Sequence, residues 1–135
     1  AMEQAASYEE ATAALANATL LVQQYFIVSG CASGEGAIIT RERLGDGDGI
    51  VRLGTPQPFG GEPYFLVVTN TDLDAQDPDG RRTKTIAMIA ALGEEGVDLD
   101  NLWTVLSTPP QFNEQTLHTE AMAPAWLEYR TFLRV

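Results

Sequence analysis

Cysteine, basic residues and long apolar runs are scarce in this sequence. The single cysteine, Cys31, excludes an internal disulfide and a zinc site built from cysteines. Only 8 lysines and arginines stand against 19 aspartates and glutamates, and the net charge of −11 repels nucleic-acid phosphates and anionic lipid surfaces. No apolar run approaches the roughly 18 residues that a membrane-spanning helix needs. We therefore expect neither a nucleic-acid partner nor a membrane span.

The first residues, "AMEQAASYEEATAAL", do not combine a basic segment with a following apolar one, so we expect no secretory signal there. Ala1 before Met2 is typical of a cloning scar, and we assign residues 1–6 to this scar and a tail. Residues 7–135 suit a single globular domain, because the chain is 44% hydrophobic and 20% charged.

The first half of the chain predicts one helix followed by strands. Ser7 and Glu10 form a capping-box pattern before an alanine-rich segment, which predicts a short helix over 7–18. Strands are predicted at 24–30 and 37–43, joined by the glycine-containing reversal "CASGEG". We then predict a loop at "LGDGDGI", a short strand over 50–53, a proline-rich and glycine-rich connection, and a strand over 64–70.

The second half predicts two helices and a final hairpin. Apolar residues at helical spacing indicate a helix over 81–92, which Gly93 ends. A second helix over 98–107 carries an apolar stripe and ends before Pro109 and Pro110. Strands near 115–122 and 126–133 would form a hairpin around residues 123–125. The fold class is therefore α+β, with a largely antiparallel sheet and helices on one face.

Two of the predicted strands, 24–30 and 64–70, are apolar without alternation. Strands of this kind belong to sheets that are covered on both faces. Three short helices cover one face only, so the pattern predicts a second layer from elsewhere. That layer is either a sheet from another chain or a symmetry mate in a homodimer.

Four segments then carry a resemblance: "YFIVSGCASGEGAIITRER", "YFLVVTN", "DGRRTKTIAMIAAL" and "LWTVLSTPPQFNEQTLHTEAMAP". In this order, from about Ser7 to Met122, the sequence resembles the C-terminal half of the acid ceramidase and N-acylethanolamine acid amidase family. The resemblance implies half of an N-terminal nucleophile hydrolase, a sandwich of helices, sheet, sheet and helices that cleaves amide bonds to fatty acyl groups. The missing layer would then be the sheet of the family's N-terminal half.

The resemblance also implies roles for four residues. In this family the nucleophile is a cysteine that becomes N-terminal after self-cleavage, and its own amine serves as the base. No such segment is present here. Asn70 matches the asparagine of the oxyanion hole and Arg81 the active-site arginine, while Asp72 and Arg82 are the implied substrate-binding residues. The sequence departs from the family pattern in reading "NTD" for "NYD", "DGRR" for "DDRR" and "SG" for "GG", and its loop between Asn70 and Arg81 is shorter.

Each of these residues also has an ordinary structural interpretation. An asparagine at the end of a strand often caps a turn, and arginines at a helix start are usually solvated charges. The helix dipole disfavours Arg81 and Arg82 there, which indicates either function or an acidic neighbour such as Asp79.

Other polar and aromatic residues suggest no further chemistry. Cys31 in a hairpin turn is a weak candidate nucleophile, because free cysteines usually behave as small hydrophobic residues. His118, the only histidine, favours a sheet surface over a metal site. The aspartates of "GDGDG" and "DLDAQDPDG" do not fit a calcium-binding loop and indicate solvated loops. Trp103 and Trp126 are interpreted as core or interface anchors.

Two functional hypotheses follow. In the first, the chain is the C-terminal part of a cysteine amidohydrolase acting on fatty acyl amides, inactive until a nucleophile-bearing half joins it in cis or in trans, and needing neither cofactor nor metal. In the second, it is a non-catalytic module of the same fold that pairs an exposed sheet face with a copy of itself or another protein.

Overall fold

The computed structural model describes residues 4–43, 45–57, 60–71 and 76–133, and it divides the chain into two units, Ala1–Thr55 and Pro56–Val135. The first unit begins with helix α1, Tyr8–Ala16. The Ser7 hydroxyl accepts a hydrogen bond from the Glu10 backbone N–H at 3.2 Å, and the Glu10 carboxylate accepts one from the Ala6 N–H at 2.8 Å. The first bond satisfies an N–H group that the first helical turn leaves without a partner, and the second ties the residue before the N-cap to the helix. The predicted helix and its Ser7 cap are confirmed, with the reciprocal Glu10 bond reaching Ala6 rather than the N-cap N–H.

A three-stranded antiparallel sheet follows α1, in the order β1 (Gln24–Ser29), β2 (Gly36–Glu42) and β3 (Gly45–Arg52). The first two strands confirm the prediction within one residue at each end. The predicted loop at "LGDGDGI" is wrong, because β3 already begins at Gly45. Pairing with β2 is a backbone interaction that needs no β-forming side chain, and a register shift between Thr40 and Glu42 admits the glycine-rich segment.

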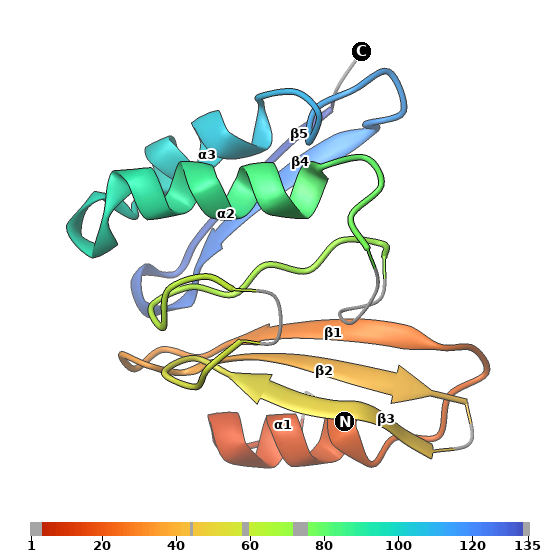
Figure 1. Cartoon of the computed structure of the whole chain (residues 1–135). Coiled ribbons are helices and arrows are strands. Elements are labelled where there is room, and N and C mark those ends of the chain that lie inside the picture. The colour runs from red at the N-terminus through yellow and green to blue at the C-terminus, as the bar shows by residue number, and fades with distance from the viewer. Residues whose placement is uncertain (1–3, 44, 58–59, 72–75, 134–135) are drawn as a thin grey trace. The chain divides into compact units, whose positions relative to one another are not determined.

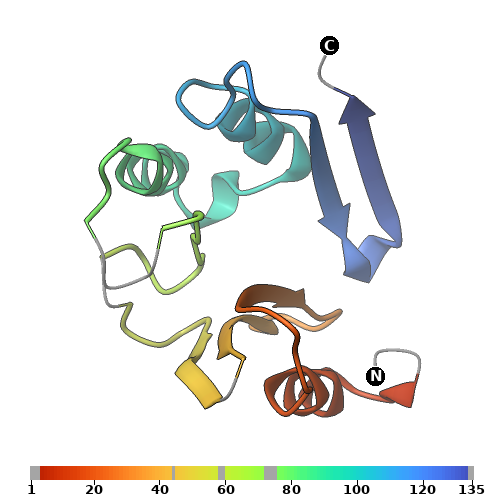
Figure 2. The same ribbon diagram turned by 90° about the vertical axis from the view of Figure 1, so that its right-hand side faces the viewer.

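Helix α1 lies along one face of this sheet (Figure 1, Figure 2). The buried Arg41 marks that face, since its guanidinium donates to the carbonyl oxygens of Leu15 and Ala18 at 3.2 and 3.0 Å. Ile39 alternates onto the same face and is 1% exposed. The opposite face carries Ile27, which is 73% exposed. Apolar side chains therefore occupy both faces of the sheet, as predicted.

In the second unit, residues 64–70 are extended but form no strand, so the predicted strand is wrong. Phe65 and Val67 pack with Ile89 and Val105 in the core of this unit. The side-chain amide of Gln57 donates to the Phe65 carbonyl oxygen, a position that a neighbouring strand would otherwise occupy. The apolar run thus identified a buried segment correctly, but no described segment pairs with it along the backbone.

Both predicted helices of this unit are confirmed. Helix α2 spans Arg81–Leu92 and ends at Gly93, which has a φ of 69°. Helix α3 spans Leu99–Leu106, and its N-cap residue Asp98 accepts a hydrogen bond from the Asn101 N–H at 2.7 Å. A short 3-10 helix, η2 (Glu94–Gly96), lies between them.

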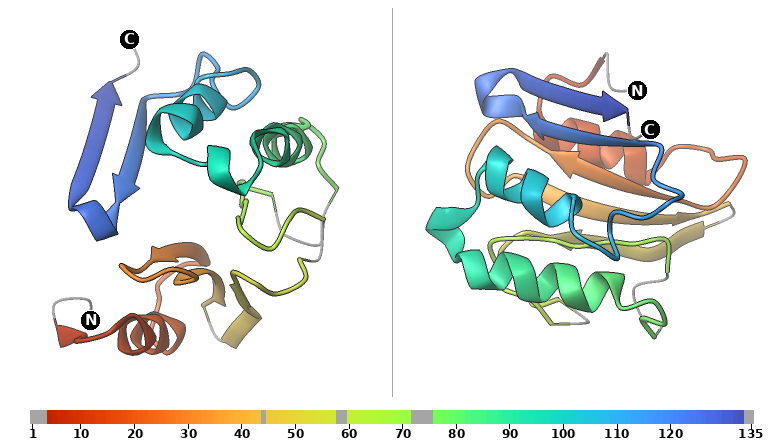
Figure 3. Two further views of the ribbon diagram at one scale, coloured as in Figure 1. Left: turned by 90° about the vertical axis from the view of Figure 1, so that its left-hand side faces the viewer. Right: turned by 90° about the horizontal axis from the view of Figure 1, so that it is seen from above.

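The chain ends in the predicted hairpin, formed by β4 (His118–Ala123) and β5 (Glu128–Leu133) around the 3-10 turn η3 (Pro124–Trp126). Helix α3 lies between α2 and this hairpin (Figure 3). Trp103 of α3 contacts Phe132 of β5, with ring centroids 4.3 Å apart, so it is an anchor as predicted. Trp126 is 72% exposed and lies outside the core. No helix within the described ranges is both long and apolar enough to cross a membrane.

Candidate active site

The start of α2 is held by a carboxylate that lies several residues before it. Gly80 occupies the N-cap position in a left-handed conformation and offers no side chain to cap the helix. Asp77 replaces that cap by accepting hydrogen bonds from the backbone N–H groups of Arg82 and Thr83, at 3.3 and 2.7 Å. These bonds, above all the one from Thr83, lower the pKa of Asp77 below its ordinary value, although burial acts in the opposite direction.

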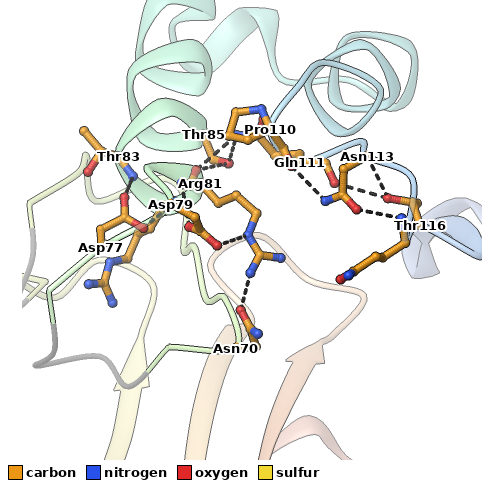
Figure 4. A network of polar contacts seen from close by, with 12 residues as sticks. Asn70, Asp77, Asp79, Arg81, Thr83, Thr85, Pro110, Gln111, Asn113 and Thr116 are labelled. Carbon is orange, nitrogen blue, oxygen red and sulfur yellow. Dashed lines mark hydrogen bonds and ion pairs between the residues drawn. The ribbon is translucent and has the colours of Figure 1, made fainter.

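Arg81 is the first residue of α2, and its guanidinium bridges two other polar residues (Figure 4). Its Nε donates to Asp79 Oδ2 at 2.6 Å, and a terminal nitrogen donates to Asn70 Oδ1. The acidic neighbour expected for an arginine at a helix start is therefore Asp79. The structure also brings together Asn70 and Arg81, which the sequence separates by 11 positions.

The orientation of the Asn70 amide follows from this contact. Because its oxygen accepts from Arg81, its NH2 group is the part left to donate to another molecule. That NH2 has no partner among the residues that the structure describes. Asn70 is exposed and follows the extended segment that Phe65 and Val67 anchor in the core. The arrangement thus presents an oriented hydrogen-bond donor at the end of a segment that is anchored in the core.

Asn70, Asp79 and Arg81 form one wall of a cavity of about 670 Å³. The other wall comes from the connection between α3 and β4, through Pro109, Pro110 and residues 112–115. A cavity of this volume falls within the range of small-molecule sites. Its walls combine two arginine-bound polar groups with proline and phenylalanine side chains, a mixture suited to a ligand with both polar and apolar parts.

The second wall is tied to α2 by two side chains. Gln111 Nε2 donates to the Arg81 carbonyl oxygen at 3.0 Å and also to Thr85 Oγ1 at 2.5 Å. The Lys84 ammonium donates to the Pro109 carbonyl oxygen at 2.5 Å. These bonds fix the distance between the connection and the helix turn that carries Arg81. Helix α2 therefore carries Arg81 of the first wall and also holds the second wall in place.

Proteins similar to this chain in sequence and in structure include acid amidases and acid ceramidases. The N-acylethanolamine-hydrolyzing acid amidase of Oryctolagus cuniculus is 36% identical over 126 residues, which cover 92% of this chain and 34% of the relative. The acid ceramidase of Heterocephalus glaber is 37% identical over 136 residues, which cover 98% of this chain and 33% of the relative. The solved structure of a Caenorhabditis elegans N-acylethanolamine-hydrolyzing acid amidase ortholog matches 99% of this chain with a TM-score of 0.82 at 28% identity.

The chain belongs to the acid ceramidase and N-acylethanolamine acid amidase family. The predicted resemblance and the N-terminal nucleophile hydrolase fold are thereby confirmed. No family model matches the sequence. The chain spans about a third of the length of the curated relatives that it matches, and 58% of the solved chain.

Asn70 and Arg81 line the cavity, and the family also implies two substrate-binding residues, Asp72 and Arg82. Asp72 lies outside the described residues. Arg82 is 4% exposed, and it points its backbone N–H at the Asp77 carboxylate. It does not belong to the cavity lining that contains Arg81. Contact of Asp72 and Arg82 with substrate stays a prediction.

Two other residues considered from the sequence are not among the residues that line the cavity. Cys31 is exposed in the turn between β1 and β2, in the first unit. His118 lies at the start of β4 with its side chain 57% exposed and its Nε2 3.8 Å from Glu120 Oε1, a sheet-surface position as predicted. Within the described ranges, no three residues of the histidine, cysteine, aspartate or glutamate types are grouped for a metal ion.

No role was predicted from the sequence for residues 109–115, the segment that supplies the second wall of the cavity. Its segment "PPQFNEQ" lies inside one of the stretches that resemble the acid amidase family, so a signal for its importance was present. Assigning it to the same site as Arg81 required the bonds of Gln111, whose amide joins positions 30 residues apart.

Proposed function

We propose that this chain is part of a cysteine N-terminal nucleophile amidohydrolase that acts on fatty acyl amides. Under this hypothesis, a segment outside the chain supplies the nucleophile, in cis or in trans. Membership in the acid amidase and ceramidase family supports the reaction class. The observation that carries the proposal is the Arg81–Asn70 contact at the wall of the cavity, because it orients an amide donor toward the space where a substrate carbonyl would lie.

In the proposed reaction the cysteine sulfur attacks the amide carbonyl carbon, and its proton passes to the cysteine's own amine. Negative charge develops on the carbonyl oxygen, and the Asn70 NH2 donates to it. The amine leaving group takes a proton and departs, and water then hydrolyses the thioester to release the fatty acid. Arg81 holds the Asn70 amide and carries a positive charge beside the same space.

The chain alone is expected to be inert, because its one cysteine, Cys31, lies in a hairpin turn of the first unit rather than at a chain start. The test is an assay for fatty acid release from an N-acylethanolamine, first with the 135-residue chain and then with the adjoining genomic segment included. We expect turnover only in the second case. Turnover by the isolated chain would refute the external nucleophile, and no turnover in any form would refute the amidase reading.

Asn70→Asp is the sharpest variant for the donor role. Aspartate keeps an oxygen for Arg81 but removes the NH2 group and places negative charge at the oxyanion position. We expect kcat of the complete enzyme to fall by about 10²–10³-fold, the size reported for loss of one oxyanion donor. Asn17→Asp is the matched control, since Asn17 is the exposed C-cap residue of α1 in the other unit. Equal kcat values for the two variants would rule out the donor role.

A second candidate function is a non-catalytic, homodimeric or partner-binding module. The observation that favours it is the face of the β4–β5 hairpin bearing Met122, Tyr129 and Leu133, which are 63%, 55% and 82% exposed. Large apolar side chains gathered on one face are typical of interaction surfaces. Light scattering during size exclusion separates the two functions: a stable dimer without amidase activity supports the module, and an active monomer excludes it.

A further inference from the structure

The carboxylate of Asp79 uses both of its oxygens on a single neighbouring residue. Oδ1 accepts from the Arg81 backbone N–H at 3.1 Å, and Oδ2 accepts from the Arg81 Nε at 2.6 Å. The Asp79 carboxylate therefore holds both the backbone at the start of α2 and the Arg81 guanidinium. The remaining freedom of a long arginine side chain is largely removed before any ligand arrives.

From this geometry we infer that Asp79 is a positioning residue, which acts through Arg81 to hold the Asn70 amide with its NH2 group toward the cavity. The inference rests on the proposed function, since it names how the oxyanion donor is kept in place. Asp79, Arg81 and Asn70 form a continuous chain of hydrogen bonds along the cavity wall (Figure 4).

The orientation of Asn70 needs such a device because an amide has two nearly isosteric ends. Rotated by half a turn, it would direct its oxygen at the developing oxyanion and repel it. The Arg81 guanidinium can only donate hydrogen bonds. It therefore bonds to Asn70 only when the amide oxygen, and not the NH2 group, faces it. Asn70 is exposed, and packing alone does not fix its side chain.

The local sequence explains how Asp79 reaches Arg81. The two residues are separated only by Gly80, whose φ of 69° lies in the left-handed region that favours glycine. This conformation turns the chain so that the Asp79 carboxylate faces the residue two positions on. We call the pair of hydrogen bonds from Arg81 to the Asp79 carboxylate the arginine clamp. The sequence "DGRR", where the family pattern has "DDRR", is compatible with this clamp.

Asp77 provides a matched comparison within the same turn. Its carboxylate also accepts from backbone N–H groups at the start of α2, but the donors are Arg82 and Thr83. No described bond joins Asp77 to the Arg81 guanidinium. Asp77→Asn and Asp79→Asn therefore make the same chemical change at the same helix end, and only the second breaks the clamp.

The test has a structural readout that needs no nucleophile. In NMR spectra of the 135-residue chain, we expect Asp79→Asn to shift the Arg81 Nε–H and Asn70 NH2 signals and to speed Nε–H exchange with water. Asp77→Asn should leave both signals in place. In the complete enzyme, Asp79→Asn should lower kcat by about 10–100-fold with little change in KM, as expected for misplacement of a group that acts in the transition state.

Asp79→Glu separates positioning from simple loss of charge. Glutamate keeps the charge but moves the carboxylate by one methylene, so we expect partial recovery of the Arg81 signal and of kcat. Unchanged Arg81 and Asn70 signals in Asp79→Asn would overturn the inference, whatever the activity. Shifted signals in a complete protein without amidase activity would instead support the clamp and refute the proposed function.

Discussion

Asp77 stabilises the start of α2 in place of the absent N-cap side chain. Its pKa is lowered in the folded protein, chiefly by the Thr83 N–H, so the bond favours folding while the carboxylate is ionised. The contribution is present above the ordinary pKa of 3.8 and is lost as the pH falls through the lower folded value. Because Asp77 is only partly buried, we expect an effect of the size of a single helix cap, about 1 kcal/mol or less.

Asp77→Ala should therefore lower the melting temperature at pH 7, and the difference from wild type should shrink as the pH falls from the ordinary pKa of 3.8 through the lower folded value, where the wild-type carboxylate also becomes protonated. Thermal unfolding between pH 2 and pH 7 measures this. Glu95→Gln, an exposed change in η2, is the control that removes a charge without removing a cap. A constant difference between Asp77→Ala and wild type at all pH values would contradict the assignment.

Gln111 is the residue that joins the two walls of the cavity. Its Nε2 serves both the Arg81 carbonyl oxygen and Thr85 Oγ1. We expect Gln111→Leu to lower the free energy of unfolding by about 1–2 kcal/mol, because it removes the donor of the partly buried bond to Thr85 Oγ1. Urea unfolding of the variant measures the loss. Gln115→Leu is the control, because Gln115 is exposed on the same connection.

At the scale of elements, two kinds of contact hold the β4–β5 hairpin against α3. Arg130 of β5 pairs with Asp100 of α3 at 2.7 Å, but their side chains are 41% and 85% exposed. Trp103 and Phe132 supply the apolar contact. An ion pair so exposed contributes little to stability, whereas burial of half a phenylalanine side chain contributes about 1–2 kcal/mol.

Phe132→Ala should consequently destabilise the hairpin more than Asp100→Asn. Hydrogen exchange of the β4 amides measures this locally, and we expect faster exchange in Phe132→Ala and nearly wild-type exchange in Asp100→Asn. Addition of 0.5 M NaCl should weaken only the ion pair. The reverse ranking would show that the charged contact, not the aromatic one, holds the hairpin.

At the scale of the whole molecule, the dominant feature is the net charge of −11 on 135 residues. Like charges repel more strongly in the compact state than in the unfolded chain, and salt screens them. We expect the melting temperature to rise by a few degrees between 20 and 200 mM NaCl. The double variant Glu94→Gln and Glu95→Gln removes two negative charges from exposed positions of η2 and should show a smaller rise. Equal salt dependence in both proteins would exclude charge repulsion as the cause.

The local elements could be predicted because their signals are local. Caps and stops within a few residues defined α1, α2 and α3, and a glycine-containing reversal defined the β1–β2 hairpin. The two errors concern strand pairing. "GDGDG" pairs with β2 although its residues disfavour strands, and residues 64–70 form no strand although theirs favour it. Pairing depends on which segment lies alongside, and no short window of sequence contains that information.

The sequence by itself determined the family, the α+β class and the two residues at the centre of the candidate site, because motifs keep their order along a chain. Only the tertiary structure decided that Asn70 accepts from Arg81, that Asp79 holds Arg81 from the other side, and that Gln111 brings residues 109–115 to the same cavity. Such bonds join positions up to 30 residues apart. They exist only once the core around Phe65, Val67, Ile89 and Val105 has fixed the backbone segments in place.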